Sequence, residues 1–522
     1  MRERRREKDK VLKSMLLLGV FLLIFGISYS LFQVALNGTK KNKITTGILS
    51  LQLLDEHDVD ITTQEASGYS IDLQNALPTS DGAGIAQEGF TFKLVNNGTI
   101  PAKYKIYLDD VELEQGESRL ADTYVKYSLI KNDSIDYPEP LSYIGTNPNR
   151  ILDMGLIKPS ETNIYTLKLW VDENADAGAM DKVFNSVLRV DGVQYNENNP
   201  FDSGTAAYTL FQTRGADLPR TLGNGFDPNS EVEGLRKYKD INNDVSYVFR
   251  GINVNNYVTY AGMTWRILRI KDDGSLKLVS EDPLNYEPTD PTRLYFGENA
   301  DAKYHLWSNT IDGITYVEVP YNYTEDDIDD VKYKDSLLER YLDSWYIDVM
   351  KNYGNRIAVS EYCSDRSEDT NSIVYFLYIT QMHMYSNVYG AYNNILIESW
   401  DHESMLTDEQ MAEMKWQPKL SCTLDKISKK VATIDAVEYI LAGGSTYGNA
   451  NYLDEEIDWW TMSPFGLDLT SNKAYVANIY DNSLIMYASV ADDLAVKPVI
   501  TLKPDSVIAS GNGSSDSPYV IG

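Results

Sequence analysis

The sequence predicts a multidomain protein with an N-terminal transmembrane or signal helix, an all-β sandwich and then an α+β domain. An uncharged apolar stretch follows the first 13 residues, and short segments of alternating apolar and polar residues come after it. Helical periodicity first appears in the C-terminal half, between further strand-like segments. With 522 residues, of which 43% are hydrophobic, the chain is long enough for two to four domains.

The N-terminus has the features of an export segment. Residues 1–13 have a net charge of +4 and are expected in the cytoplasm, whereas residues 14–37 contain no charge. At about 1.5 Å per residue, a helix over most of 14–37 spans roughly 33 Å, enough to cross a membrane. A cleaved signal peptide is the alternative, with processing near Ser30, because Ser28 and Ser30 are small. In both cases the rest of the chain is exported, either secreted or anchored by its N-terminus.

The composition is strongly acidic. The formal net charge is −30, and it is −35 once the basic residues 1–40 are set aside. Binding to DNA or RNA phosphates requires a surplus of Lys and Arg, so the charge argues against nucleic acid as a partner. An acidic surface attracts cations, so calcium is the one cofactor that we consider.

Residues 38–195 are predicted to form the β-sandwich. Their apolar residues alternate by twos, as in a sheet with one face toward a core. Asn96-Asn97-Gly98 is a tight-turn pattern, so the segments before and after it are predicted to form a hairpin. The predicted strands are 46–53, 90–95, 102–108, 124–130, 163–171 and 183–190.

Residues 196–225 are rich in Asn, Asp, Gly and Pro and predict a linker, after which residues 226–522 form the α+β module. Residues 256–280 predict three strands, with turns at 261–262 and 272–274. Apolar residues every four positions predict a helix over 335–353, and Thr433 is the expected cap of a helix over 434–442. Further strands are expected at 473–480, 484–490 and 496–502.

The only two cysteines, Cys363 and Cys422, both lie in the exported part. Outside the cell such a pair is expected to form a disulfide, and neither residue belongs to a CxxC motif. The loop it closes contains 60 residues, counting both cysteines.

Two acidic segments are candidates for calcium binding, because hard cations prefer carboxylate and carbonyl oxygens. The denser is the run Asp326, Asp327, Asp329 and Asp330. In the other, Asp172, Asn174 and Asp176 alternate as in a calcium loop, but no Glu stands at the twelfth position. Solvated loops explain both segments as well.

Aromatic residues are the candidate ligand contacts. The chain has 38 tyrosines, whose rings and hydroxyls suit recognition of sugars or proteins. Trp459 and Trp460 are adjacent and are expected to point to opposite faces of a strand, with one indole in the core and the other available to a ligand.

The sequence shows no catalytic constellation. It has four histidines and no HExxH, GxSxG or phosphate-loop motif, so we expect a non-enzymatic protein. The alternative of a glycan-active enzyme stays open, because two of the 77 Asp and Glu residues could lie at the separation that glycoside hydrolysis requires.

Two resemblances extend this interpretation. The leader, the segment ITTGILSL at 44–51, FTFKLVNNGTIPAKYKIYL at 90–108 and YTLKLWVDENAD at 165–176 resemble the exported camelysin/TasA-like β-sandwich proteins of Gram-positive bacteria. That family populates the cell surface and biofilm matrix. A dedicated signal peptidase cleaves its members near small residues before a Phe, so the resemblance implies processing near Ser30. From GLRKYK at 234 to WWTMSPFG at 459 and SPYVIG at the C-terminus, the second half resembles an uncharacterised module of Firmicutes surface proteins. That module resembles the C-type-lectin-like or formylglycine-generating-enzyme fold.

These observations lead to one expected function and one structural alternative. We expect a bacterial cell-surface protein whose β-sandwich stalk presents an adhesin-like module to a glycan or to a surface or matrix protein. Its N-terminal segment would provide the contact with the membrane. The alternative is a structural component of an extracellular matrix or fibre.

Overall fold

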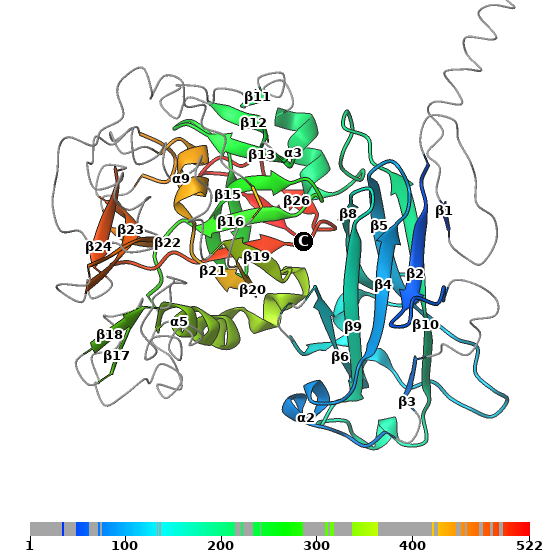
Figure 1. The fold of residues 1–522 in the computed structure, drawn as a ribbon. Coiled ribbons are helices and arrows are strands. Elements are labelled where there is room, and N and C mark those ends of the chain that lie inside the picture. The colour runs from blue at the N-terminus through cyan, green and yellow to red at the C-terminus, as the bar shows by residue number, and fades with distance from the viewer. Residues whose placement is uncertain are drawn as a thin grey trace, which may run out of the picture. The chain divides into compact units, whose positions relative to one another are not determined.

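The protein is a multidomain, β-rich chain in which helices are few (Figure 1). It divides into two compact units, Met1–Asn132 with Pro140–Glu197, and Asp133–Glu139 with Asn198–Gly522. The computed structural model describes residues 34–35, 48–61, 71–73, 76–132, 134, 137–214, 221–222, 233–240, 242–285, 308–311, 314–317, 337–363, 420–421, 426–444, 450–454, 457–468, 473–480, 484–489 and 494–522.

The first unit contains two antiparallel sheets. One has the strand order β1-β10-β5-β8, with β3 also on β10, and the other has the order β2-β4-β9-β6-β7. The strands of these two sheets are β1 (Val34–Ala35), β2 (Leu51–Asp55), β3 (Ile71–Leu73), β4 (Phe90–Asn96), β5 (Ala102–Asp110), β6 (Val125–Lys131), β7 (Glu139–Pro140), β8 (Ile151–Ile157), β9 (Thr162–Val171) and β10 (Phe184–Gln194). Glu139, the first residue of β7, is counted with the second unit. The short helices of the first unit are α2 (Asp81–Ile85), η2 (Asp122–Tyr124), η3 (Leu141–Ile144) and η4 (Ala177–Ala179).

The two sheets share one hydrophobic core. Phe92 and Leu94 of β4 and Ile106 and Leu108 of β5 are fully buried and belong to the same apolar cluster. Every second residue of β5 is buried, so the predicted period of two is confirmed there.

The predicted hairpin between 90–95 and 102–108 is wrong. β4 pairs with β2 and β9, whereas β5 pairs with β10 and β8, so the two strands lie in different sheets. The buried Asn96 explains the change of sheet. Its side chain donates to the carbonyls of Ile100 (3.0 Å) and Ile157 (3.1 Å) and accepts from the Gly98 amide (2.9 Å), which turns the chain away from β4.

The second unit is built on a mixed sheet of ten strands. Its longest path is β11-β12-β13-β15-β14-β27-β26, while β16 pairs with both β15 and β25, and β21 pairs with β25. These strands are β11 (Thr221–Leu222), β12 (Gly234–Lys239), β13 (Val245–Arg250), β14 (Tyr257–Tyr260), β15 (Met263–Lys271), β16 (Leu276–Ser280), β21 (Val431–Ala432), β25 (Val499–Leu502), β26 (Ile508–Ser510) and β27 (Tyr519–Ile521).

Smaller sheets and a few helices complete the described part of this unit. Strand β23 is the predicted strand 473–480, and the two predicted turns between β14, β15 and β16 are confirmed. The remaining elements are β17 (Ser308–Ile311), β18 (Ile314–Val317), β19 (Ser360–Cys363), β20 (Lys426–Lys429), β22 (Trp459–Asp468), β23 (Lys473–Tyr480), β24 (Leu484–Ser489), α3 (Ala206–Arg214), α5 (Leu337–Trp345), η8 (Tyr346–Met350), η9 (Lys351–Arg356) and α9 (Ala436–Ala442).

The expectation of a linker over 196–225 is wrong for its first part. Residues 198–214 belong to the second unit, where Phe201 and Leu210 are buried in its core. The helix α3 forms because Ala206, Ala207 and Leu210 present one apolar face to that core. Except for β11, residues 215–232 lie outside the described part of the chain.

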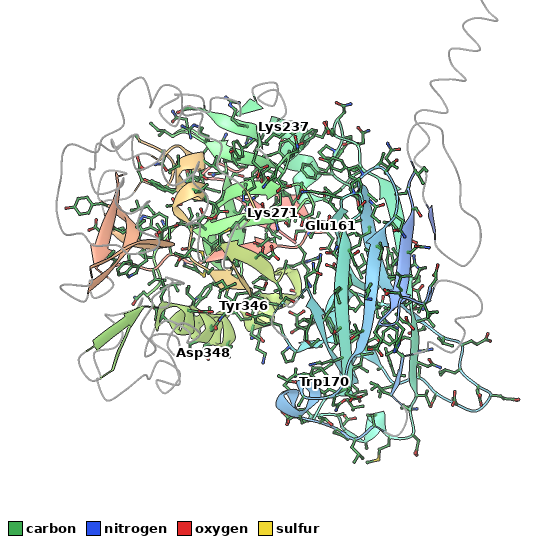
Figure 2. All side chains as sticks on the ribbon, in the orientation of Figure 1. Glu161, Trp170, Lys237, Lys271, Tyr346 and Asp348 are labelled. Carbon is green, nitrogen blue, oxygen red and sulfur yellow. The ribbon has the colours of Figure 1, made fainter. Side chains whose placement is uncertain are left out.

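The predicted helix over 335–353 is continuous in sequence but changes type. It is α-helical in α5, π-helical in η8 and 3-10 in η9 (Figure 2 labels Tyr346 and Asp348 on the π-helical turn). The wider π turn shifts the buried face by one residue. Tyr346 and Met350 therefore enter the core, whereas Val349, expected on the apolar face, is 38% exposed.

The second predicted helix has a different cap. Asp435, not Thr433, caps α9, and its carboxylate accepts from the Glu438 amide at 2.9 Å. Gly443 ends the helix in the left-handed conformation, with φ of 117°.

Most of the predicted export segment lies outside the described residues, including residues 1–13 and Ser30. Val34–Ala35 forms strand β1, paired with Gly192 and Asp191 of β10, so the predicted helix over 14–37 is wrong at its C-terminal end. In the described part of the chain no helix is long and apolar enough to cross a membrane.

Candidate functional site

Trp459 and Trp460, the expected ligand contacts, are both fully buried. The expectation that one indole is exposed is wrong, because β22 is covered on both faces. Trp459 meets the Tyr439 ring of α9 edge-on at 6.2 Å and the Lys497 ammonium at 5.1 Å. Among the described residues, neither indole N–H has a hydrogen-bond partner.

The other predicted sites are only partly described. Asp326, Asp327, Asp329, Asp330 and Cys422 lie outside the described residues. Cys363 is buried at the end of β19, and no described cysteine has a free thiol; its pairing with Cys422 stays a prediction. Within the described ranges no group of three or more His, Cys, Asp or Glu side chains is placed to hold a metal.

In the alternating segment at 172–176, the carboxylates of Asp172 and Asp176 accept hydrogen bonds from nearby residues. Asp172 accepts from the Asn174 amide at 2.9 Å, and Asp176 accepts from the Gly178 amide at 2.7 Å and the Tyr124 hydroxyl at 2.8 Å. These contacts define Asx turns within the loop, and calcium binding there stays a prediction.

The site that the structure adds is a basic face of the central sheet of the second unit. In the pairing of β15 with β16, Arg266 lies opposite Val279 and Arg269 lies opposite Lys277. The register shifts between Ile267 and Arg269, so one residue of β15 is extra. This bulge places Arg266 and Arg269 on one face together with Lys277, although residues three apart in a regular strand face opposite sides.

Glu438 of α9 provides the carboxylate for two of these cations. Its Oε1 accepts from Lys277 Nζ at 2.7 Å and from Arg269 Nε at 3.0 Å, and all three side chains are buried. Burial lowers the pKa of Lys277, and the nearby Arg269 adds to this effect while Glu438 opposes it. All seven residues of α9 are buried, so Glu438 is fixed deep in the unit.

Arg266, the third cation, extends this cluster toward the surface. Its guanidinium lies 3.8 Å from the Tyr257 ring centroid and 4.8 Å from that of Tyr452, and its Nε donates to Asn256 Oδ1 at 2.7 Å. The carboxylate of Glu281, 28% exposed, is 3.3 Å away. Burial is the main cause of the raised pKa of Tyr257, and Glu281 adds to it. A partly exposed ring and carboxylate thus border a buried guanidinium, an arrangement that suits polar recognition.

The interior of the second unit is rich in cations. Its described part buries eight basic side chains but four carboxylates. Among the described residues of this unit, burial therefore removes more positive than negative charge from the surface of a chain whose net charge is already −30. The basic residues are Arg236, Arg250, Arg266, Arg269, Lys277, Lys429, Lys430 and Lys497, and the carboxylates are Glu139, Asp240, Asp435 and Glu438.

Chemically, this site holds buried cations beside a carboxylate and aromatic rings. Lys277 is enclosed by Glu438 and, at 4.6 Å, by the Tyr362 ring, so its amine is oriented by buried groups on both sides. Sequence reasoning did not find this site, since only the bulge brings Arg266 and Arg269 to one face. No family model and no curated protein matches the chain.

Proposed function

We propose that the chain is a non-enzymatic bacterial cell-surface protein whose second unit is an adhesin-like binding module and whose first unit, a β-sandwich, acts as a stalk. The predicted export segment places both units outside the cell. Two β-rich units with separate cores suit the division between support and recognition. The mixed sheet with few helices is compatible with the C-type-lectin-like fold that the sequence resemblance implies.

The observation that carries the proposal is the separation of charge in the second unit. Its described part buries eight cations and only four carboxylates, and the chain has a net charge of −30, which favours a surface on which carboxylates dominate. Such a surface repels anionic polymers and attracts basic groups. The preferred partner is therefore a basic surface or matrix protein, followed by a neutral glycan. Calcium, if it binds, would do so at the acidic run 326–330.

A binding screen of the whole exported part tests this function. A fragment starting at residue 226 would lack α3 and residues 133–139, both of which belong to the second unit. Immobilised basic and acidic matrix proteins, neutral glycans and anionic cell-wall polymers should be compared, with calcium or with chelator. We expect binding to a basic protein that weakens as salt increases. Absence of binding in every class by well-folded protein would contradict the proposal.

A structural role in fibres is the second candidate, and the edge of β10 favours it. In the described part, β1 covers only Asp191 and Gly192 of this edge and β3 covers only Phe184–Ser186. The stretch between them can accept a strand from another chain. Concentration-dependent polymers of the whole exported part, which retains β1, would support this role, and a persistent monomer in light scattering would contradict it.

A further inference from the structure

Arg266 is held in place by hydrogen bonds that leave one edge of its guanidinium unused. Its side chain is 4% exposed, and in the sheet it lies directly opposite Tyr257 of β14. Its Nε donates to Asn256 Oδ1 at 2.7 Å, and its Nη1 donates to the Tyr452 carbonyl at 2.9 Å. Among the described residues, none accepts a hydrogen bond from Nη2. An almost buried cation with unpaired N–H groups is costly, so this edge is suited to a ligand.

The carboxylate of Glu281 does not use this edge. Both of its oxygens face Nη1 of Arg266, at 3.3 and 3.4 Å, whereas a closely paired arginine and carboxylate form two parallel hydrogen bonds of about 2.7–2.9 Å. The position of Glu281 is fixed by its backbone amide, which donates to the Thr264 carbonyl of β15 at 2.9 Å. Its side chain is 28% exposed, so the carboxylate can still accept a hydrogen bond from outside the protein.

Tyr257 adds a ring and a hydroxyl at the same place. Its ring centroid lies 3.8 Å from the guanidinium carbon of Arg266, and its hydroxyl donates to the Glu281 carboxylate. Its backbone amide donates to the Gly513 carbonyl at 2.9 Å, and the residue is partly exposed. The end of β16, from which Glu281 follows, therefore meets β15 and β14 at a point that combines donors, an acceptor and an aromatic ring (Figure 1 labels β15 and β16).

The charges at this point disfavour ionic ligands. An anionic group would accept from Arg266 but would approach the carboxylate of Glu281, in a chain of net charge −30. A basic group would pair with Glu281 but would approach the guanidinium, which is 3.3 Å from that carboxylate. A neutral molecule with adjacent hydroxyls avoids both repulsions, because one hydroxyl oxygen can accept from Nη2 while the next hydroxyl donates to Glu281. The ring of Tyr257 offers an apolar surface to the C–H groups of such a molecule.

We propose that Arg266, Glu281 and Tyr257 form a binding site for a neutral sugar, which they recognise through two adjacent hydroxyl groups. This inference rests on the binding role proposed for the second unit, and it assigns the neutral glycan to a defined site. In the complex, Arg266 Nη2 donates to one hydroxyl oxygen and Glu281 accepts from the neighbouring hydroxyl. The Tyr257 ring packs against the sugar, and no metal ion takes part.

Sugar titrations of the full-length chain test this site. The probes are the methyl glycosides of glucose, galactose, mannose and N-acetylglucosamine, and saturation-transfer NMR detects their binding and gives Kd. We expect at least one probe to bind, with a Kd that changes with neither chelator nor salt, unlike binding of a basic protein. Loss of a charge-assisted hydrogen bond in Glu281→Gln should weaken this binding about tenfold or more, and loss of the hydroxyl in Tyr257→Phe about threefold.

Matched controls separate the site from the rest of the surface. Asp282→Asn and Tyr353→Phe, at exposed positions, should leave Kd unchanged, and a probe whose adjacent hydroxyls have been cleaved by periodate should not bind. If Glu281→Gln does not fold, Tyr257→Phe serves alone, because it keeps the ring.

Two results would overturn the proposal. One is a Kd that is the same in the folded site variants as in the wild type, which would place the sugar elsewhere. The other is a folded wild-type chain that binds none of the four probes. If a basic protein still binds to that chain, the adhesin function stands without this site, so the two failures can be told apart.

Discussion

Lys429 and Lys430 are adjacent in the chain, yet their pKa values shift in opposite directions. Burial lowers the pKa of both ammonium groups. At Lys429 the carboxylates of Asp343 and Glu339 outweigh burial and raise the pKa, whereas at Lys430 the single carboxylate of Glu139 does not. Asp343 and Glu339 are one turn apart on α5 and together outweigh burial at Lys429. At Lys430 a single carboxylate opposes both burial and the nearby Lys503.

Replacing these two lysines should have unequal effects on stability. Lys430→Met leaves the Glu139 carboxylate buried without a cation and should lower the free energy of unfolding by about 3 kcal/mol. Lys429→Met should cost about 1–2 kcal/mol, because one of its two carboxylates, Asp343, is 33% exposed and water can solvate it, whereas Glu339 is 12% exposed. Urea unfolding at neutral pH measures both. Equal losses of stability in the two variants would contradict this prediction. Adding Glu139→Gln to Lys430→Met should recover part of the larger loss, because the buried carboxylate is then removed as well.

Glu438 should be the most sensitive acidic position of the basic face. Glu438→Gln leaves Arg269 and Lys277 buried without their counter-ion, so we expect a loss of about 3–5 kcal/mol in the free energy of unfolding. The matched control is Glu281→Gln, which should cost less than about 1 kcal/mol because Glu281 is partly exposed. Denaturant unfolding followed by tryptophan fluorescence compares them. Similar losses would show that Glu438 does not neutralise the cluster.

The folded protein should lose stability as the pH rises above about 10, where unfolded tyrosine ionises. Burial raises the pKa of Tyr104 and Tyr165, and nearby Asp153 adds to the effect; burial also raises the pKa of Tyr137 to about 12. A raised folded pKa means that the unfolded chain releases its protons first, so stability is complete below pH 10 and falls above it. Tyrosinate absorbance during an alkaline titration measures this. A single step near pH 10 in the folded protein would contradict it.

Removing the predicted disulfide should destabilise the second unit. A covalent loop of 60 residues between Cys363 and Cys422 restricts the unfolded chain by roughly 4 kcal/mol. We expect Cys363→Ser to lower the free energy of unfolding by up to that amount, and reductant to do the same to the wild type. Peptide mapping without reduction identifies the linked cysteines directly. A Cys363→Ser variant that still responds to reductant would point to another cause.

The sequence predicted local structure best where one face of an element meets a core. The strands β4, β5 and β9 agree closely with the predicted ranges because the pleat repeats every two residues whatever the neighbouring strand is. The same pattern contains no information on the partner strand. The Asn96-Asn97-Gly98 turn therefore predicted a hairpin, although its neighbours pair in different sheets.

The helical predictions show a similar limit. Leu338, Leu342 and Trp345 are buried as their spacing predicted. After Trp345 the π turn changes the spacing, so Met350 replaces Val349 in the core. The sequence pattern suits a continuous α-helix, and tertiary packing selected the wider turn.

By itself, the sequence determined the acidity, the β-rich class and most strand positions, since these depend on composition and short-range periodicity. It also predicted the export segment. Only the tertiary structure decided where the charges lie. A one-residue bulge in β15 brought Arg266 and Arg269 to one face, and the segment 133–139 provided Glu139 to Lys430, 291 residues away in sequence. Burial makes such long-range pairs necessary, because a charge removed from water requires a partner, wherever in the chain that partner comes from.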